Sequence, residues 1–443
     1  MQREVNLLKT EIKIISKKFL EDNDEIEIIS HFDTDGITSA AIMIKTLKEL
    51  DKKFSVKIIK SLEQEFIYSL PKNKKILFLD LASSSLDHIK EARLKNIFII
   101  DHHEIHQEIP KGINIINPKV NNGQRISASG LTYLFCKEIN PNSKKFAKLA
   151  ILGMIGDQLE KEIDTLNNGI LNDGEVQKRR GLLIYPSTRP LNRTLEFCSS
   201  PFIPGITGDT KGVLELLREA ELKPSKTGYK SLIELTQEEM ERLITAVTLR
   251  NPKAKHNEMI GDIFLIKLFN KLEDARELSA KINACSRFGE TSLALKLCME
   301  IPEARKKAEL IHAKYKQLLV SGLKFANETE KINGKGFVII NAKNNIRETM
   351  IGTVASILSN SSLYEEGTII TTMAYYDDKI KVSARNVGRN GKNVREILNS
   401  VIEIIGGEIG GHKNAAGCII PQEKEQEFIN KLKRNLEVEI VRI

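Results

Sequence analysis

One short motif, HFDTDG at residues 31–36, carries three side chains that could bind a metal ion. His31, Asp33 and Asp35 occupy alternate positions, so they would project to one side if the chain stays extended past its strand. Imidazole and carboxylate ligands without a thiolate suit a hard or borderline cation, and Mn²⁺ or Mg²⁺ fits better than a structural Zn²⁺. The motif therefore predicts part of a metal centre.

Further histidine and aspartate residues follow two apolar runs that are typical of buried strands. Asp80 ends the run ILFL, and the run IFII is followed by Asp101, His102 and His103. Ligands of open parallel sheets bind at the carboxyl ends of the strands, so three separate segments would deliver these groups to one rim. Two cations about 3.5 to 4 Å apart could activate water there and neutralise charge on a phosphoryl group. Asp80, alone at its strand end, is the candidate that would bridge them.

Each of these residues also has an ordinary structural interpretation. An aspartate such as Asp80 or Asp157 is most often a turn or N-cap residue, and paired histidines are commonly polar surface. The combination favours a functional centre, because four of the eight histidines fall inside compact polar or glycine-rich motifs.

A second group of polar residues lies near the C-terminus. The segment GGEIGGHKNAAG at 406–417 offers flexible backbone and N–H groups for an anion, with His412 and Lys413 beside them. A cationic and hydroxyl-bearing cluster suited to phosphate lies upstream and consists of Ser383, Arg385, Arg389 and Lys392. A turn-rich hairpin and a solvated basic loop are the alternatives for these two segments.

Apolar runs that alternate with helical patterns predict the elements that position the first group. Strands are expected at 25–33, 54–59, 75–80, 96–101 and 113–117, with helices at 37–50 and 84–95. This alternation favours a mostly parallel sheet covered by helices on both faces. Residues 129–156 have a helical pattern that leads to Asp157.

The sequence predicts a catalytic α/β domain over 1–160, followed by three further parts. A mainly helical middle region covers 161–300, a long connecting helix that begins at a proline covers 301–330, and a smaller α/β domain covers 331–443. In this last part, strands are expected at 336–341, 368–376 and 379–386, and helices at 351–360 and 393–405.

Composition sets limits on the class of protein. The chain has 41% apolar and 28% charged residues, as a globular protein does, and its formal charge of +8 is spread along the sequence. That charge would help to attract a polyanion, although a solvated surface is the simpler explanation. The five scattered cysteines never form C-x-x-C and are interpreted as buried free thiols in a reducing cytoplasm. We expect a cytoplasmic protein without a signal peptide or membrane span.

In this order, HFDTDG, LDLASSS (79–85), DHH (101–103) and LGMIGD (152–157) resemble the motifs of the DHH phosphoesterase superfamily. The segment GGHKNAAG resembles the glycine-rich motif of the DHH-associated domain, except that Ile409 stands where that motif often has a first glycine. The length and the segment 274–289 resemble archaeal RecJ-like exonucleases, including the GINS-associated nuclease.

The resemblance implies a role for each candidate residue. One metal ion would be bound by His31, Asp33 and Asp80. The other would be bound by Asp35, Asp80, His102 and Asp157. His103 would face the phosphate, and the substrate would be held by Ser383, Arg385, Gly410, Gly411 and His412. We assign Asp101 to orient the adjacent histidines, because ligating imidazoles usually donate their second N–H to an acceptor.

The leading hypothesis is a two-metal exonuclease, with Mn²⁺ or else Mg²⁺, that degrades single-stranded DNA or RNA to mononucleotides in DNA replication or repair. The middle region motivates a long substrate, since related enzymes for dinucleotides or phosphoadenosine phosphate need only the two terminal domains. With 5% aromatic residues, backbone charge rather than base stacking would dominate binding. The alternatives are a scaffold bound to GINS and the replicative helicase, a small-substrate phosphatase and, more distantly, a pyrophosphatase or exopolyphosphatase.

Overall fold

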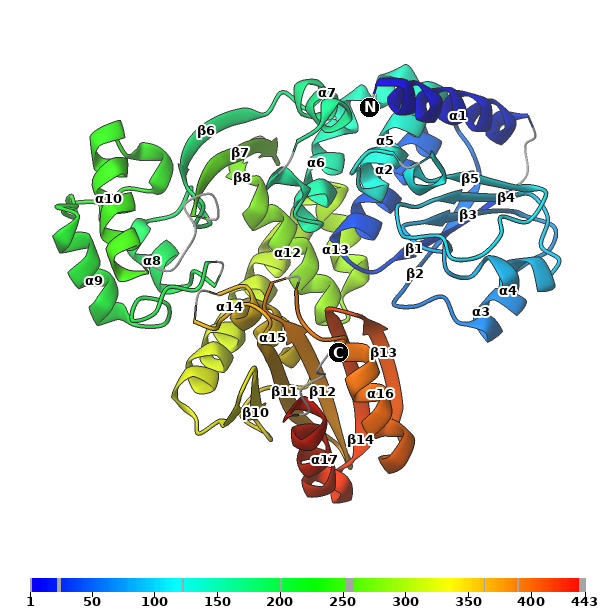
Figure 1. The fold of residues 1–443 in the computed structure, drawn as a ribbon. Helices are drawn as coiled ribbons and strands as arrows, with labels where there is room; N and C mark the ends of the chain where they lie inside the picture. Colours follow the sequence, from blue (N-terminus) through cyan, green and yellow to red (C-terminus); the bar gives the residue numbers. More distant parts are fainter. Residues whose placement is uncertain are drawn as a thin grey trace. The chain divides into compact units, whose positions relative to one another are not determined.

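The structure, a computed structural model, describes most of the chain and divides it into two compact units. The described residues are 2–21, 25–121, 123–161, 163–199, 201–251, 259–361, 363–388 and 390–437. The first unit consists of Met1–Arg179 and Ile263–Ala313, and the second of Arg180–Asp262 and Lys314–Ile443. Helix α14, Pro302–Glu328, begins in the first unit and ends in the second, as the predicted connecting helix does (Figure 1).

Five parallel strands form the sheet of the first unit, in the order β2-β1-β3-β4-β5. They are β1 Ile26–His31, β2 Phe54–Ile59, β3 Lys75–Leu79, β4 Ile97–Ile100 and β5 Ile113–Ile116. Each lies within two residues of a predicted strand, because all five coincide with apolar runs. Parallel strands end at the same edge of a sheet, so the residues that follow β1, β3 and β4 come together there.

Helices cover both faces of this sheet, as the sequence predicts (Figure 1). One apolar core joins alternate strand residues such as Ile28, Leu77 and Phe98 to the larger helices. These helices are α1 Gln2–Leu20, α2 Thr34–Glu49, α5 Ala128–Ile139 and α6 Ala147–Gly156. The other core joins the intervening strand residues to the short helices α3 Gln64–Tyr68 and α4 Leu86–Glu91.

Two helices that the sequence analysis placed in the middle region belong to the first unit. Helices α12 Ala275–Arg287 and α13 Thr291–Cys298 share the apolar core of α2 and α6. The Thr34 hydroxyl also donates a hydrogen bond of 3.2 Å to the carbonyl oxygen of Ser279 in α12. The compact units divide near residues 179, 263 and 313, because tertiary packing brings distant segments together.

The middle region contains helices, as predicted, and also a three-stranded sheet. Its helices are α7 Thr165–Asp173, α8 Leu191–Glu196, α9 Thr210–Glu219 and α10 Gln237–Arg250. The sheet has the order β6-β7-β8, formed by Gln177–Leu182, Ile260–Leu268 and Lys271–Asp274. The first of these strands has the sequence QKRRGL and is largely exposed, so no apolar run announces it. A short 3₁₀ turn of this region spans Leu232–Glu234, and others in the chain span Pro118–Asn121, Pro141–Phe146, Leu159–Lys161 and Gln422–Lys424.

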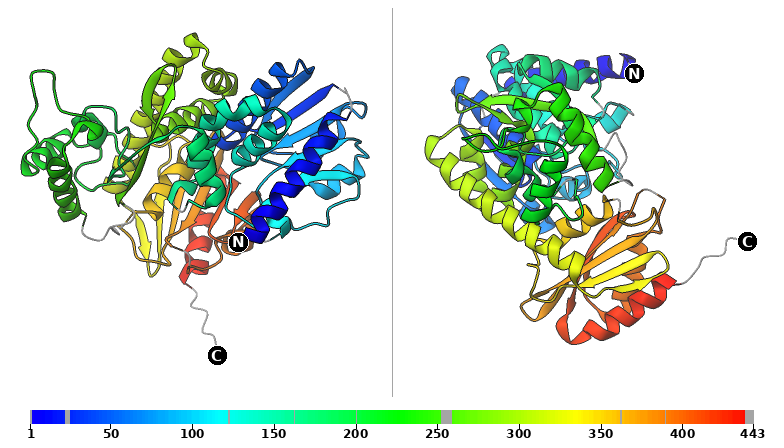
Figure 2. Two further views of the ribbon diagram at one scale, coloured as in Figure 1. Left: turned by 90° about the horizontal axis from the view of Figure 1, so that it is seen from above. Right: turned by 90° about the vertical axis from the view of Figure 1, so that its left-hand side faces the viewer.

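The C-terminal part of the second unit is a six-stranded sheet in the order β13-β14-β12-β11-β10-β9. These strands are β9 Ile332–Gly334, β10 Phe337–Asn341, β11 Ile369–Tyr376, β12 Lys379–Asn386, β13 Glu408–His412 and β14 Ala415–Pro421. Helix α15, Ile351–Ser359, packs on β11 and β12. The apolar core on the other face joins the sheet to α16 Val394–Ile405 and α17 Glu425–Glu437 (Figure 2). The glycine-rich segment is thus an antiparallel hairpin, the alternative to a flexible loop.

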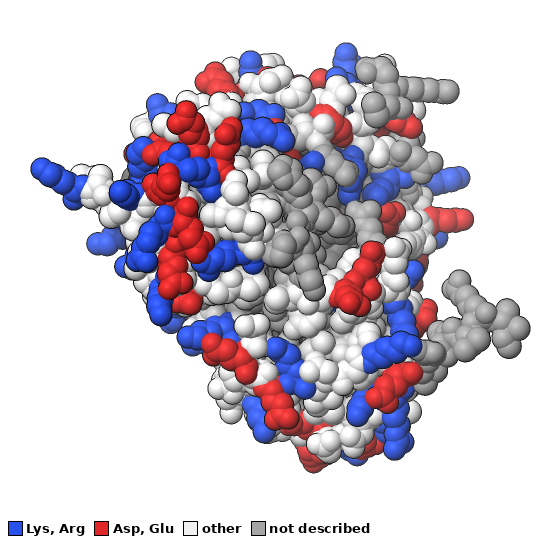
Figure 3. Space-filling view, turned by 60° about the vertical axis from the view of Figure 1, so that its left-hand side comes forward, with Lys and Arg blue, Asp and Glu red and all other residues white. Residues whose placement is uncertain are grey.

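The distribution of surface charge and the burial of the cysteines match what the composition predicts. On the face that Figure 3 shows, Lys and Arg side chains are interspersed with Asp and Glu rather than gathered into one basic patch. All five cysteines lie in the described part of the chain, buried and outside any disulfide bond. Among the helices of the described residues, none is long and apolar enough to cross a bilayer.

Gly153 provides a test of the packing that positions the metal-site helices. A Cβ atom at Gly153 of α6 would lie 2.0 Å from the Ser129 hydroxyl oxygen and 2.4 Å from a carboxylate oxygen of Asp35. We expect Gly153→Ala to lower the free energy of unfolding by about 1 to 3 kcal/mol. In α7, a Cβ atom at Gly169 would meet nothing within 4 Å. Gly169→Ala should therefore raise the free energy of unfolding by about 0.5 to 1 kcal/mol. Urea denaturation measures both, and equal effects would contradict this packing.

Candidate metal centre

The six predicted metal ligands meet at the carboxyl edge of the first sheet. Their ligand atoms form clusters in which every atom lies within 4.8 Å of the others. One cluster contains His31, Asp33 and Asp80. A second contains Asp35, His102 and Asp157. A third joins Asp80 to His102 and His103.

Asp80 belongs to the first cluster and also faces His102 of the second. Its Oδ2 atom is 3.3 Å from Nδ1 of His31, and its Oδ1 atom is 3.4 Å from Nε2 of His102. The backbone of Asp80 has a φ of +60°, in the left-handed region that aspartate tolerates better than most residues. Such a conformation is retained where the surroundings require it, often at functional sites. The two oxygens are therefore placed as a bridging carboxylate requires.

The first cluster is built on the turn between β1 and α2. Asp33 is the N-cap of α2 and accepts a 3.0 Å hydrogen bond from the Gly36 N–H, which is why the helix begins three residues before the predicted start. Its other oxygen, Oδ2, lies 3.1 Å from Nδ1 of His31. A Cβ at Gly36 would lie 2.2 Å from the His31 carbonyl oxygen, so the tight turn requires glycine. Capping and metal binding are compatible here.

The second cluster joins three helices to the end of β4. The buried carboxylate of Asp35 accepts hydrogen bonds of 2.7 and 3.0 Å from the N–H groups of Ala128 and Ser129, in the first turn of α5. His102 Nε2 lies 3.9 Å from Asp35 and 3.4 Å from Asp157. Asp157 is the C-cap of α6, where the negative end of the helix dipole opposes a carboxylate. A cation would relieve that repulsion.

Several ligand atoms of the centre are buried and have no hydrogen-bond partner among the described residues. They are Nδ1 of His31, both carboxylate oxygens of Asp80 and Oδ2 of Asp157. Buried polar atoms are nearly always satisfied, so four such atoms within two neighbouring clusters indicate a missing partner. Carboxylate and imidazole donors suit Mn²⁺ or Mg²⁺. The residues present therefore fit a divalent cation.

The pKa values of the cluster reflect the same excess of negative charge. Burial and the nearby charge of Asp35 raise the pKa values of Asp80 and Asp157 well above the usual range. Burial alone would lower the pKa of His31, but contact with the carboxylates of Asp33 and Asp80 raises it to about 10. Burial alone would raise the pKa of Asp33, but contact with His31 lowers it to about 2. Without metal, a proton on His31 supplies the positive charge that the carboxylates require.

Asp101 and His103 form a separate pair beside the ligands. The buried carboxylate of Asp101 lies 2.7 Å from Nδ1 of His103 and accepts a 2.8 Å hydrogen bond from the main-chain N–H of His102. Asp101 thus orients the ring of His103, whereas its contact with His102 is to the main chain. This pairing raises the pKa of His103, while the hydrogen bond from His103 outweighs burial and lowers the pKa of Asp101. The His103 side chain is 55% exposed, so its other nitrogen can meet a ligand.

Asn117 is a residue of this rim that the sequence analysis did not single out. Its buried side-chain amide donates hydrogen bonds of 2.9 Å to the Ser83 hydroxyl and to the His103 carbonyl oxygen. The main-chain N–H of Ser83 in turn donates a hydrogen bond to Asp101. The sequence does contain a signal for this residue, because Asn117 follows β5 just as Asp80 follows β3 and Asp101 follows β4.

The predicted substrate-binding residues lie in the second unit, in three successive rows of its C-terminal sheet. Ser383 pairs with Gly417, which pairs with Gly410, across β12, β14 and β13. Gly411 pairs with Ala416 in the middle row, and in the third row Arg385 and His412 both pair with Ala415. The guanidinium Nε of Arg385 donates a 3.1 Å hydrogen bond to the Ser356 hydroxyl of α15.

The upstream basic cluster is less compact than its sequence suggests. The ammonium group of Lys392 donates a 2.7 Å hydrogen bond to the carbonyl oxygen of Leu436, at the end of α17, and so is tied to that helix. Arg389 lies outside the described residues.

Three domain models of one superfamily match successive parts of the chain. The DHH family N-terminal domain matches residues 25–154, the DHH-CID domain 184–259 and the DHHA1 domain 334–437. The chain belongs to the DHH superfamily. The first match contains five of the six predicted metal ligands, the last contains the predicted substrate-binding residues, and the DHH-CID match falls in the middle region.

Known proteins resemble this DHH protein along its whole length. An uncharacterized protein of Methanocaldococcus jannaschii is 27% identical over 98% of each chain. The structure of exonuclease RecJ bound to manganese matches with a TM-score of 0.61 and 17% identity, over 98% of this chain and 95% of RecJ. Cdc45 from Entamoeba histolytica matches with a TM-score of 0.71 and 10% identity, over 97% and 99% of the two chains. The fold is RecJ-like, which confirms the predicted fold class, and the domain matches support a DHH-type phosphoesterase.

Replacement of Asp80 by asparagine tests its place between the two clusters. Asparagine keeps the left-handed backbone but removes a buried carboxylate, so metal-free Asp80→Asn should unfold at a higher temperature than the wild type. The wild type should gain about 3 to 4 kcal/mol from Mn²⁺ at 100 to 1,000 times its Kd, and the variant should lose most of that gain. Differential scanning fluorimetry with and without Mn²⁺ measures both effects.

The raised pKa of Asp80 gives the same variant a pH signature. A group whose pKa is higher in the folded state than in the unfolded chain costs stability as pH rises above its unfolded value, about 4 for aspartate. The metal-free wild type should therefore lose more stability between pH 4 and 8 than Asp80→Asn. Asp87→Asn, an exposed change in the same domain, is the control. An unchanged Mn²⁺ response in Asp80→Asn would contradict the assignment.

Proposed function

We propose that this DHH protein is a metal-dependent exonuclease that hydrolyses single-stranded DNA or RNA to mononucleotides by a two-metal mechanism. The observation that carries the proposal is Asp80, whose two carboxylate oxygens face separate clusters of histidine and aspartate. Such an arrangement suits a pair of cations that share one ligand. The likeness to an exonuclease, RecJ bound to manganese, supports both the reaction and Mn²⁺ as the ion.

Each cluster would hold one divalent ion. His31 and Asp33 would bind the first, and Asp35, His102 and Asp157 the second, with Asp80 between them. When bound, the ions lower the pKa of water and neutralise the negative charge of a phosphoryl group under attack. The chain itself fixes the ligands before substrate arrives, because Asp33 caps α2 and Asp35 is held by two N–H groups of α5.

His103 would contact the phosphate group. Asp101 occupies its Nδ1 atom, so the Nε2 atom is the one directed to a ligand. The raised pKa keeps His103 protonated at higher pH than a free imidazole, and a protonated imidazole can donate a charge-assisted hydrogen bond to a phosphate oxygen. Asn117 and Ser83 act as positioning residues, since they hold the turn that carries Asp101 and His103.

The second unit would hold the strand. These residues lie at matching positions on β12 and β13, on either side of β14: Ser383, Arg385, Gly410, Gly411 and His412. The middle region, which a small-substrate phosphatase would not need, favours a longer substrate. A function in DNA replication or repair is part of this proposal.

The likeness to Cdc45 supports a second candidate function, a scaffold that binds GINS and the replicative helicase. The full set of ligand residues favours the enzyme, and one chain can serve both functions.

Strands labelled at the 5′ or the 3′ end, of DNA and RNA in parallel, test the exonuclease. With Mn²⁺, the purified protein should release labelled mononucleotides from one end of a single strand. Asp33→Ala should slow this by more than about 100-fold, because residues that merely orient metal ligands are already worth about 10- to 100-fold. Asp87→Ala removes an exposed carboxylate of the same domain and should leave the rate unchanged.

Two results would refute parts of this proposal. Wild-type activity in Asp33→Ala would exclude the metal centre as the site of hydrolysis. Cleavage of dinucleotides with longer strands left intact would replace the exonuclease by a small-substrate phosphatase, with the metal centre unchanged.

A further inference from the structure

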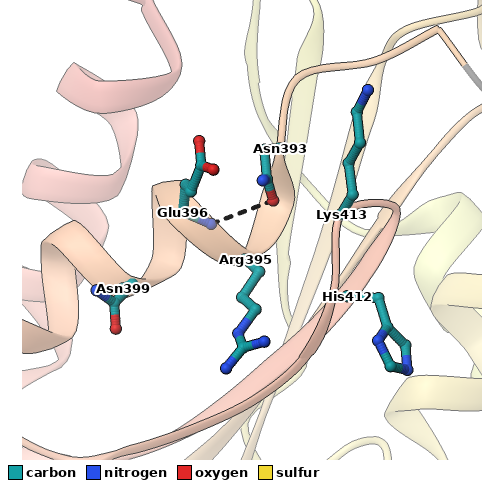
Figure 4. A pocket seen from close by; sticks show the side chains of 6 residues that line it. All are labelled: Asn393, Arg395, Glu396, Asn399, His412 and Lys413. Atoms are coloured by element: carbon teal, nitrogen blue, oxygen red, sulfur yellow. Dashed lines mark hydrogen bonds between the residues drawn. The ribbon is translucent and has the colours of Figure 1, made fainter. Parts of the chain in front are cut away.

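A hollow in the second unit lies beside the tip of the β13–β14 hairpin and has a volume of about 470 Å³. It is lined by two sets of side chains, one from the start of α16 and one from the hairpin: Asn393, Arg395, Glu396, Asn399, His412 and Lys413 (Figure 4). The main-chain N–H of Val394 donates a 2.8 Å hydrogen bond to the carbonyl oxygen of Lys413. This bond joins the helix to the hairpin, so the walls of the hollow are fixed to each other.

The charged side chains of the hollow separate into two sides. In Figure 4, the guanidinium group of Arg395 and the ring of His412 extend to one side, and Glu396 and Lys413 extend to the other. Arg395 is exposed and makes no ion pair or side-chain hydrogen bond with the described residues. The Arg395 side is thus cationic, whereas Lys413 shares its side with a carboxylate.

The strand surface next to His412 is bare. A Cβ atom at Gly410, two residues before His412, would meet nothing within 4 Å. Gly411 is different, because its φ of +120° and a Cβ position 2.4 Å from the Ala415 carbonyl oxygen both require glycine. The fold needs Gly411 but not Gly410, and the open space at Gly410 leaves room for a ligand beside His412.

We propose that Arg395 and His412 together form a phosphate subsite for the backbone of a single-stranded nucleic acid. This inference rests on the proposed function and adds to it a residue, Arg395, that lies outside the sequence motifs. A guanidinium group binds phosphate through two parallel hydrogen bonds, so arginine is better suited than lysine to this role. The open strand at Gly410 would let the sugar-phosphate backbone approach the imidazole and the guanidinium.

Binding of a fluorescein-labelled 12-nucleotide DNA strand to the full-length protein tests the subsite. The measurement is fluorescence anisotropy in EDTA, which prevents metal-dependent cleavage, at several KCl concentrations. Arg395→Gln should raise the Kd about 10-fold and reduce the slope of log K against log salt by about 0.7, the value for one contact to a single strand. Arg395→Lys should keep the slope and recover part of the affinity.

A matched control separates the subsite from general charge. Arg434 of α17 is also exposed and makes no ion pair with the described residues, so Arg434→Gln removes the same charge from the same domain. It should leave the Kd and the slope unchanged. Lys413→Gln should have a smaller effect than Arg395→Gln, because Lys413 extends to the side of Glu396.

The outcomes distinguish this inference from the proposed function. Equal effects of Arg395→Gln and Arg434→Gln, or no effect of Arg395→Gln, would overturn the subsite, whatever the protein cleaves. If Arg395→Gln weakens binding as expected but the wild type with Mn²⁺ cleaves no strand, the subsite stands and the exonuclease fails. Thermal unfolding of each variant should match the wild type, since both arginines are exposed.

Discussion

The position of the Asp80 carboxylate, buried among histidine and aspartate side chains that could hold metal ions, is the constraint on which the site depends. Aspartates gathered at one rim repel each other, and burial adds to the cost, so the arrangement requires positive charge between them. Neighbouring features hold the ligands in place against this repulsion. Asp33 caps α2, two N–H groups of α5 hold Asp35, and Gly153 lets α6 approach closely enough to present Asp157.

Much of this centre could be predicted from the sequence, because its residues immediately follow apolar runs. A parallel sheet brings the ends of its strands to one edge, so His31, Asp80 and His102 were expected to meet. The strand-end position of Asn117 carries the same signal, but asparagine is so common in turns after strands that this position alone does not indicate a functional residue. The grouping of residues 263–313 with the first unit could not be predicted, since it depends on helix packing between segments far apart in sequence.

The C-terminal sheet shows where local sequence is ambiguous. Its glycine-rich segment suggested a flexible loop, yet it forms paired strands in which Gly410 and Gly411 differ in the space around them. The backbone requires glycine at Gly411, whereas Gly410 is open to solvent. His412 and Arg385 lie in motifs that the sequence displays, whereas Arg395 is brought to the hairpin only through the docking of α16.

The most direct test of the bridging carboxylate is a Mn²⁺ titration of the full-length protein, followed by electron paramagnetic resonance and native mass spectrometry. Two ions that share Asp80 would lie about 3.5 to 4 Å apart, close enough for their electron spins to couple. The account predicts two Mn²⁺ ions per chain and the spectrum of a coupled pair. A single ion per chain, or two ions with the spectrum of isolated Mn²⁺, would contradict it.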